Sequence, residues 1–142
     1  METVKNSIKK HEGFRNKVYK DTLGKRTIGY GHLCVEDWWE DDKEYTQAEL
    51  ERIFDKDFDK AKEGASKLYE GCEINDTAKG VIIEMVFQLG TTGVSKFKNM
   101  WKALKETPPN YSVAKIEMLD SRWAKQTPNR AKELSNTMGG II

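Results

Sequence analysis

Apolar residues recur at helical spacing over most of the chain. The first such stretch predicts a short helix over residues 2–12, with an apolar face formed by Val4, Ile8 and His11. A much longer helix is expected from Thr46, because Thr46 and Glu49 have the spacing of a capping box. The apolar face that follows comprises Leu50, Ile53, Phe54, Phe58, Ala61, Ala65 and Leu68. We expect this helix to connect a small sheet region to a helical body.

Helical spacing continues to the end of the chain. We expect Asp76 to cap a helix that is apolar nearly all round, which is typical of a helix in the middle of a core. Gly90 is expected to interrupt that helix, and Ser112 is expected to cap another over residues 113–119. Shorter helical pieces complete the chain.

Between Phe14 and Leu33 the pattern changes from helical to strand-like. Two short runs of strand-forming residues flank Asp21-Thr22-Leu23-Gly24, which is typical of a hairpin turn in which glycine adopts a positive φ. No other convincing sheet is predicted. The expected fold class is therefore α+β, mostly α.

Composition narrows the class of protein. At 142 residues, the chain has the size of one domain and needs no metal or disulfide to fold. It has no run of 18 apolar residues and no apolar secretory signal, so we expect neither membrane insertion nor a signal peptide. Cys34 and Cys72 can be free thiols or one disulfide, and we favour free thiols. Without metal-ligand spacing or a cofactor motif, we expect no metal and no cofactor.

Charge is distributed unevenly along the chain. The formal net charge of +1 conceals balances of +5 over residues 1–35, −7 over 36–63 and +3 over 64–142. This near-neutral total argues against a dedicated nucleic-acid binder. The two basic ends either share a positive face towards an anionic polymer or are ordinary solvated helix faces.

Three polar residues stand out around the predicted hairpin. Glu12 ends a helix, where the negative end of the dipole favours the protonated carboxyl group that a general acid needs. Asp21 lies at the turn and Thr27 on the returning strand, where a carboxylate and a hydroxyl could hold one water. Two carboxyl groups in different environments are the minimal equipment for glycoside hydrolysis, although both positions are also everyday choices for a helix end and a turn.

Three separated blocks of sequence resemble the phage-type lysozymes, a family of glycoside hydrolases. The blocks are residues 12–33 with Thr27-Ile28-Gly29-Tyr30-Gly31-His32-Leu33, residues 75–93 with Met85-Val86-Phe87-Gln88, and residues 121–132 with Gln126-Thr127-Pro128-Asn129-Arg130. The resemblance implies a single bilobed lysozyme-like domain over residues 1–142. In it, a β lobe over about 13–45 would be joined by a connecting helix over about 46–68 to a helical lobe formed by 1–12 and about 69–142.

The resemblance also implies an activity and its residues. The enzyme would hydrolyse the β-1,4 bond between N-acetylmuramic acid and N-acetylglucosamine in bacterial peptidoglycan, with inversion, in a cleft between the lobes. Glu12 would be the general acid, Asp21 the base or charge stabiliser, and Thr27 would help to position the water. The positive charge of the matching Arg130 would oppose protonation of Glu12.

Other matching positions have lesser roles. Leu33 and Phe87 correspond to residues that line the cleft, although Phe87 is equally compatible with core packing. His32 and Asp57 correspond to a stabilising ion pair between the sheet lobe and the long helix. Trp123 is expected in the core.

The chain also departs from the family pattern. Only twelve residues separate Leu33 from Thr46, so the sheet lobe is shortened, and the chain stops at Ile142 without a last helical segment. Trp38-Trp39 in that short segment either stack on sugars or cover the small core, and we favour the second. Glu117 and Met100 replace smaller polar residues that bind substrate in the family. These departures affect specificity more than activity.

Two other functions remain open. A wall-binding relative could have lost catalysis, and a lytic transglycosylase would leave an anhydro sugar without needing a base such as Asp21. For the lysozyme, we expect a monomer that is made in the cytoplasm without a signal peptide and acts on the cell wall after release.

Overall fold

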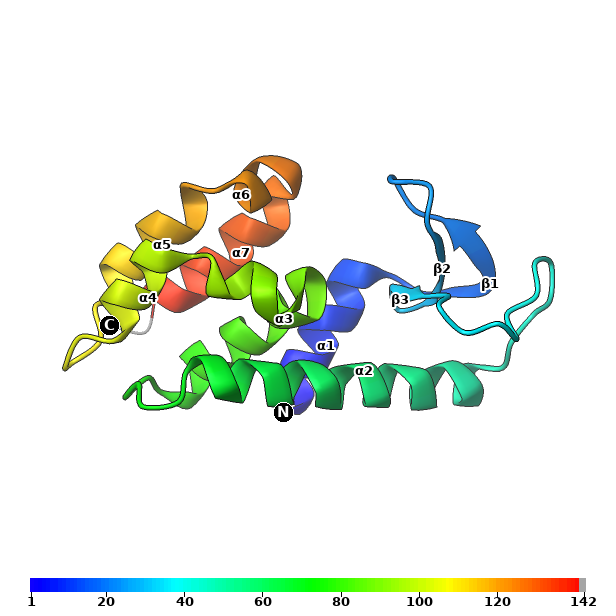
Figure 1. The fold of residues 1–142 in the computed structure, drawn as a ribbon, viewed down its shortest axis with the longest axis horizontal. Helices are drawn as coiled ribbons and strands as arrows, with labels where there is room; N and C mark the ends of the chain where they lie inside the picture. Colours follow the sequence, from blue (N-terminus) through cyan, green and yellow to red (C-terminus); the bar gives the residue numbers. More distant parts are fainter. Residues whose placement is uncertain (141–142) are drawn as a thin grey trace. The chain divides into compact units, whose positions relative to one another are not determined.

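The computed structural model describes residues 1–140. Its helices are α1 (Glu2–Glu12), α2 (Gln47–Leu68), α3 (Asp76–Ser95), α4 (Lys98–Leu104), α5 (Tyr111–Leu119), α6 (Arg122–Gln126) and α7 (Pro128–Gly139) (Figure 1). The strands β1 (Arg15–Lys20), β2 (Arg26–Gly29) and β3 (His32–Leu33) form one antiparallel sheet in the order β1-β2-β3. The predicted fold class, α+β and mostly α, is confirmed.

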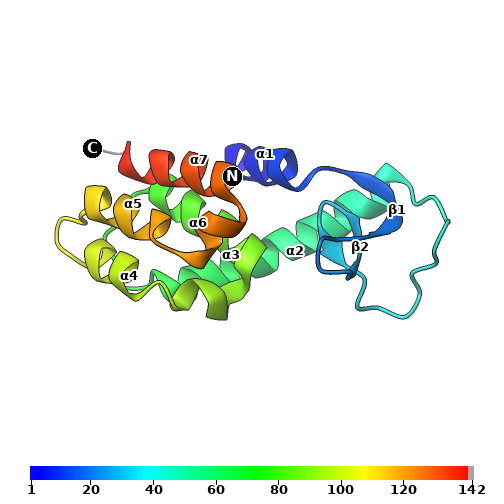
Figure 2. The same ribbon diagram turned by 90° about the horizontal axis from the view of Figure 1, so that it is seen from above.

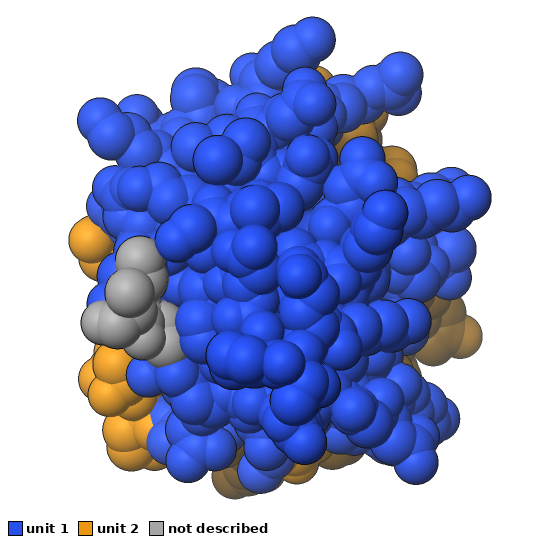
Figure 3. Space-filling view, turned by 90° about the vertical axis from the view of Figure 1, so that its left-hand side faces the viewer, with its two compact units in different colours: residues 1, 61–142 blue, residues 2–60 orange. Residues whose placement is uncertain are grey.

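Contacts divide the chain into two compact units, coloured separately in Figure 3. Residues 2–60 form what we call the sheet unit, which contains α1, the sheet and the first part of α2. The helical unit is formed by Met1 and the residues from 61 onward. The sequence analysis places residues 1–12 with the helical lobe, whereas these contacts group α1 with the sheet.

The predicted hairpin is confirmed. Tyr19 pairs with Thr27 and Lys20 with Arg26 across β1 and β2, so the turn lies over the residues between these strands. β3 then returns along β2, with Ile28 opposite His32 (Figure 1). The sheet therefore brings residues of the turn and of all three strands into one small region.

A small apolar core supports the sheet. Ile28, Trp39, Tyr45 and Leu50 are buried together, with Val18, Cys34 and Ile53 packed against them. The rings of Trp39 and Tyr45 meet edge to face at a centroid distance of 4.9 Å. The prediction that Trp38-Trp39 cover this core is right for Trp39, which is 6% exposed, and wrong for Trp38, which is 58% exposed. Trp38 belongs to a turn and Trp39 directly follows it, and only the ring of Trp39 faces inward.

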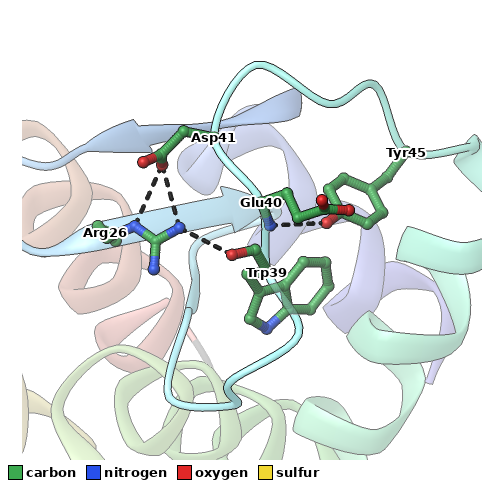
Figure 4. A network of polar contacts seen from close by, with 5 residues as sticks. All are labelled: Arg26, Trp39, Glu40, Asp41 and Tyr45. Atoms are coloured by element: carbon green, nitrogen blue, oxygen red, sulfur yellow. Dashed lines mark hydrogen bonds and ion pairs between the residues drawn. The ribbon is translucent and has the colours of Figure 1, made fainter.

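Polar contacts hold the segment that carries these tryptophans (Figure 4). The guanidinium of Arg26 donates to the Asp41 carboxylate at 3.0 and 3.2 Å and to the Trp39 carbonyl at 3.0 Å. The backbone N–H of Glu40 donates to the Tyr45 hydroxyl at 2.9 Å. Because both contacts and the buried Trp39 act on the same few residues, this connection has a defined conformation despite lacking helix or strand.

Within the sheet unit, Lys5 and Lys9 of α1 both form ion pairs with α2, and the Lys9 pair is the shorter. Lys9 Nζ donates to Glu51 Oε2 at 2.9 Å and lies about 5 Å from the ring centroids of Tyr30 and Phe54. Tyr30 also donates its hydroxyl to Glu51 at 2.9 Å. The end of α1 is thereby held beside the β2–β3 turn.

Of the three capping residues predicted from the sequence, one is confirmed. At α2, Glu49 N–H donates to Thr46 Oγ1 at 3.1 Å and Thr46 N–H donates back to Glu49 Oε1 at 3.3 Å, which confirms the capping box. The predictions of Asp76 and Ser112 as caps are wrong. The caps are Asn75 for α3 and Asn110 for α5, whose side chains accept from Ala78 and Val113 N–H. Their amide oxygens cap as well as the neighbouring residues would.

The core of the helical unit lies around the first part of α3, which is buried nearly all round from Ala78 to Val86. Gly90, with φ 81° and ψ 161°, interrupts α3 as predicted. In the same unit α5 packs against α4 and α7 (Figure 2). Within residues 1–140, no helix is both long and apolar enough to cross a membrane.

The two adjacent tryptophans make a matched pair for testing this packing. We expect Trp39→Ala to lower the free energy of unfolding by about 3–5 kcal/mol, because it empties a buried site. Trp38→Ala should change it by less than about 0.5 kcal/mol, since that ring buries little surface. Urea unfolding followed by circular dichroism measures both, and equal losses would contradict the assignment of Trp39 alone to the core.

Candidate active site

The Glu12 carboxyl group lies against Gly31 in the β2–β3 turn. Glu12 is the last residue of α1, and the chain leaves the helix with Gly13 N–H donating to the Lys9 carbonyl at 2.9 Å. Glu12 Oε1 lies only 2.5 Å from where a Cβ atom at residue 31 would stand. Gly31 also has a φ of +76°, which other residues rarely adopt. The positive φ of the turn therefore favours glycine at 31, and any side chain there would displace the Glu12 carboxyl group from its present place.

Asp21 shapes the hairpin turn with one of its two carboxylate oxygens. Oδ1 accepts from Leu23 N–H at 2.8 Å and from Lys25 N–H at 2.9 Å. Among the hydrogen bonds formed within residues 1–140, both that reach this carboxylate go to Oδ1. The other oxygen, Oδ2, is thus oriented by the turn yet available to a water or a ligand.

Thr27 is joined to Asp21 through one residue, Lys25. The Thr27 hydroxyl donates to the Lys25 carbonyl at 3.0 Å, and that carbonyl also accepts from Asp21 N–H at 2.9 Å. Thr27 is buried, with 3% of its surface exposed. Because its proton is engaged with Lys25, the Thr27 oxygen is left as an acceptor. Asp21 and Thr27 therefore present two acceptors fixed by the same turn.

The pKa of Tyr19 is raised by its surroundings in this region. Burial raises the pKa of the Tyr19 hydroxyl, and the negative charges of Glu12 and Asp21 raise it further against the opposing effect of Arg15. Tyr19 is also the strand partner of Thr27. All three candidate residues thus lie around one tyrosine. The sequence analysis assigned Tyr19 no role, although its place beside the turn was a usable signal.

The two residues expected to line a cleft belong to different units. Leu33 is exposed on β3 and is paired with Thr27 on β2, so it lies in the candidate site. Phe87 is half-buried on α3 in the helical unit. The involvement of Phe87 with the sheet unit stays a prediction.

Arg130 forms a buried ion pair inside the helical unit. Its Nε donates to Glu84 Oε2 at 2.9 Å, and the two residues are 8% and 1% exposed. A buried charge is tolerated only when it is paired in this way. The sequence analysis missed Glu84, whose signal was a lone acidic residue in the apolar run of α3. The expected effect of Arg130 on Glu12 stays a prediction.

His32 is held between two carboxylates instead of the one predicted. Its Nδ1 lies 2.7 Å from Asp57 Oδ2, and its Nε2 lies 2.9 Å from Glu36 Oε1. Glu36 also accepts from Trp39 Nε1 at 2.6 Å. The predicted pair with Asp57 is present, and Glu36 extends it to the segment after β3. The histidine therefore links α2 to the segment that carries Trp39.

The net charge environment favours the imidazolium form of this histidine. Burial acts most strongly and lowers the pKa of His32, but hydrogen bonds and charges of Asp57 and Glu36 together raise it above the usual 6.5. The same contacts lower the pKa of Glu36 against the effect of its own burial. Both observations describe one ion cluster that stabilises the sheet unit.

The remaining predictions concern the two cysteines, metal binding and Trp123. Cys34 and Cys72 are free thiols, as favoured, and burial raises the pKa of each. Within the described residues, no group of three or more His, Cys, Asp and Glu side chains could hold a metal ion. Trp123 is buried and donates its Nε1–H to Gln88 at 2.8 Å, which confirms its place in the core.

The two substitutions noted in the sequence, Met100 and Glu117, line one pocket of about 520 Å³ in the helical unit. Met100 is fully buried there, and Glu117 is half-buried. Lys96, Phe97 and Arg122 belong to the same lining.

The chain was compared with known proteins. The model of the family described as Phage lysozyme matches residues 9–137. Two proteins of Dictyostelium discoideum, named Probable T4-type lysozyme 1 and Probable T4-type lysozyme 2, are each 30% identical over 158 aligned positions, covering 93% of this chain and 91% of the relative. As the alignment exceeds 142 positions, these relatives hold residues without a counterpart here. The Pre-baseplate central spike protein Gp5 of Enterobacteria phage T4 is 29% identical over 90% of the chain, but over only 26% of its own length.

The ion cluster around His32 predicts a pH dependence of stability. Because the folded-state pKa is raised, His32 stabilises the fold below the unfolded value of 6.5, and this contribution is lost as the pH rises through the folded-state pKa. The difference in free energy of unfolding between wild type and His32→Gln should therefore be larger at about pH 6 than at about pH 9. Urea unfolding at both values measures it, and an equal difference would show that the imidazolium is not the stabilising form.

Proposed function

Because the chain belongs to the phage lysozyme family, we propose that it hydrolyses the β-1,4 bond between N-acetylmuramic acid and N-acetylglucosamine in bacterial peptidoglycan, with inversion. The observation that carries this proposal is the grouping of Glu12, Asp21 and Thr27 in the sheet unit. The Glu12 carboxyl group packs against a glycine, whereas Asp21 and the Thr27 hydroxyl are both bonded to Lys25 of the hairpin turn. Such an unequal pair suits one acid and one base.

Glu12 acts as the general acid in this proposal. Its carboxyl group packs against Gly31 and delivers its proton to the leaving glycosidic oxygen. As the proton moves, the bond to the anomeric carbon breaks and Glu12 is left ionised.

Asp21 and Thr27 hold the attacking water. The water donates one hydrogen to Asp21 Oδ2 and the other to Thr27 Oγ1, which leaves an oxygen lone pair directed at the anomeric carbon. Asp21 accepts a proton as the new C–O bond forms, and Thr27 only positions the water. Attack from the face opposite the leaving group inverts the anomeric centre, a mechanism that requires carboxyl groups about 6.5–9.5 Å apart.

The remaining assignments complete the proposal. Leu33 contacts the glycan from the sheet unit and Phe87 from the helical unit, where Glu84 holds the Arg130 guanidinium. The enzyme acts as a monomer on the bacterial wall after release from the cytoplasm where it is made. A wall-binding protein without activity and a lytic transglycosylase are the alternatives, and the availability of Asp21 Oδ2 and Thr27 Oγ1 favours a hydrolase over both.

Product analysis tests the proposed reaction. We expect purified peptidoglycan treated with the protein to gain new reducing ends, identified by mass spectrometry. Glu12→Gln should lower the rate by roughly 10²–10⁴-fold, because the amide cannot donate a proton to the leaving group. Glu2→Gln is the matched control, since it removes a carboxylate from the exposed first turn of the same helix and should leave the rate unchanged.

Each other outcome contradicts a defined part of the proposal. Anhydro ends in place of reducing ends would identify a transglycosylase. No product from the wild type would favour the inactive wall-binding protein. Undiminished cleavage by Glu12→Gln would remove Glu12 from the mechanism.

A further inference from the structure

A second pocket lies in the sheet unit, away from the residues assigned to catalysis. It has a volume of about 490 Å³ and is lined by the segment around residues 38–45 and by the first half of α2. The segment contributes Trp38 and Tyr45 to the lining, and α2 contributes Arg52 and Lys56. Glu12, Asp21 and Thr27 are not part of this lining. The pocket therefore needs an explanation of its own.

The exposed ring of Trp38 is the first feature of this pocket. Trp38 is more than half exposed, and its ring centroid lies 6.0 Å from that of the buried Trp39. The residues that follow it are held by the Arg26 guanidinium, which donates to the Trp39 carbonyl and to Asp41, and by the Tyr45 hydroxyl, which accepts from the Glu40 N–H (Figure 4). Trp38 is thus a large flat apolar surface presented to solvent on a fixed segment. Binding a ligand there costs little ordering of the protein.

Two cations on one side of α2 are the second feature. Arg52 and Lys56 lie one turn apart on α2, both exposed, and neither takes part in the ion pairs formed within residues 1–140. Like charges at this spacing repel each other. The third cation, Lys43, is paired with Glu40 at 3.7 Å. Glu49 also lines the pocket and acts electrostatically on Arg52, but its carboxylate is hydrogen-bonded in the capping box and forms no ion pair with Arg52 within residues 1–140. The pocket therefore offers two cations to an anionic group of a ligand.

We propose that this pocket is a second, non-catalytic site for the peptidoglycan glycan strand. The apolar C–H face of a sugar ring packs on Trp38, while Arg52 and Lys56 bind a carboxylate carried by the strand. This inference rests on the proposed function and deepens it, because it adds a second contact with the same polymer. On an insoluble wall, such a contact keeps the enzyme on the strand between cleavage events.

Binding to purified sacculi tests this site without interference from hydrolysis. In a Glu12→Gln background, we expect Trp38→Ala and the double substitution Arg52→Ala/Lys56→Ala each to weaken co-sedimentation by about tenfold. The matched control is Lys60→Ala/Lys62→Ala, which removes two exposed cations of α2 that do not line the pocket. It should bind like the parent.

Chemical modification of the wall separates the two contributions. On sacculi whose carboxylates have been amidated, the deficit of Arg52→Ala/Lys56→Ala should vanish, whereas that of Trp38→Ala should remain. With wild-type Glu12, hydrolysis of a short soluble glycan should be unchanged in both variants, because neither touches the catalytic residues.

The proposal is overturned if Trp38→Ala binds sacculi as tightly as its parent, or if the control loses as much affinity as Arg52→Ala/Lys56→Ala. It is also overturned if both variants lose activity on the short glycan, since the pocket would then belong to the catalytic site. These outcomes leave the proposed function intact when the wild type still releases reducing ends. Failure of the parent to bind sacculi and of the wild type to cleave them would overturn both.

Discussion

The close approach of a carboxyl group to a glycine backbone is the constraint on which the candidate site depends. Glu12 Oε1 occupies the space that any side chain at residue 31 would need. Two elements must therefore be placed together: the end of α1 and the turn between β2 and β3. Lys9 supplies part of that placement, because it binds Glu51 and lies over Tyr30, the neighbour of Gly31. A positive φ and the contact with Glu12 meet at the same residue, so a side chain at 31 would disturb both the turn and the position of the acid.

The other half of the site depends on a single turn. Lys25 donates its N–H to Asp21 and accepts from both Asp21 and Thr27 through its carbonyl, so one residue relates the proposed base to the proposed water-binding hydroxyl. The His32 cluster and Trp39 stabilise the same sheet from its other side, through Glu36 and Asp57. The side chains that stabilise this unit are thus different from those proposed to act in catalysis. The segment after β3 belongs to the stabilising part, through Glu36 and Trp39, and also carries the exposed Trp38.

Local sequence was sufficient where the physics is local. The hairpin, α1 and the capping box of α2 follow from spacing and turn chemistry within a few residues. Asn75 and Asn110 were missed as caps because a second good capping residue stands within two positions of each. Glu84 was missed because its partner Arg130 lies 46 residues away and is brought to it only by the fold. The partners of Glu36 lie within four residues, but they meet in a segment without helix or strand, whose geometry spacing does not predict. The different exposure of Trp38 and Trp39 depends on which way that segment faces. Tertiary contacts decide such questions, not periodicity.

The configuration of the first-formed product tests the central claim most directly. If Asp21 and Thr27 hold a water that attacks opposite the leaving group, proton NMR during early hydrolysis must show the α-anomer at the new reducing end before mutarotation. The account predicts that signal. A β-anomer formed first would mean retention through a covalent or shielded intermediate, and it would contradict the roles proposed for both residues.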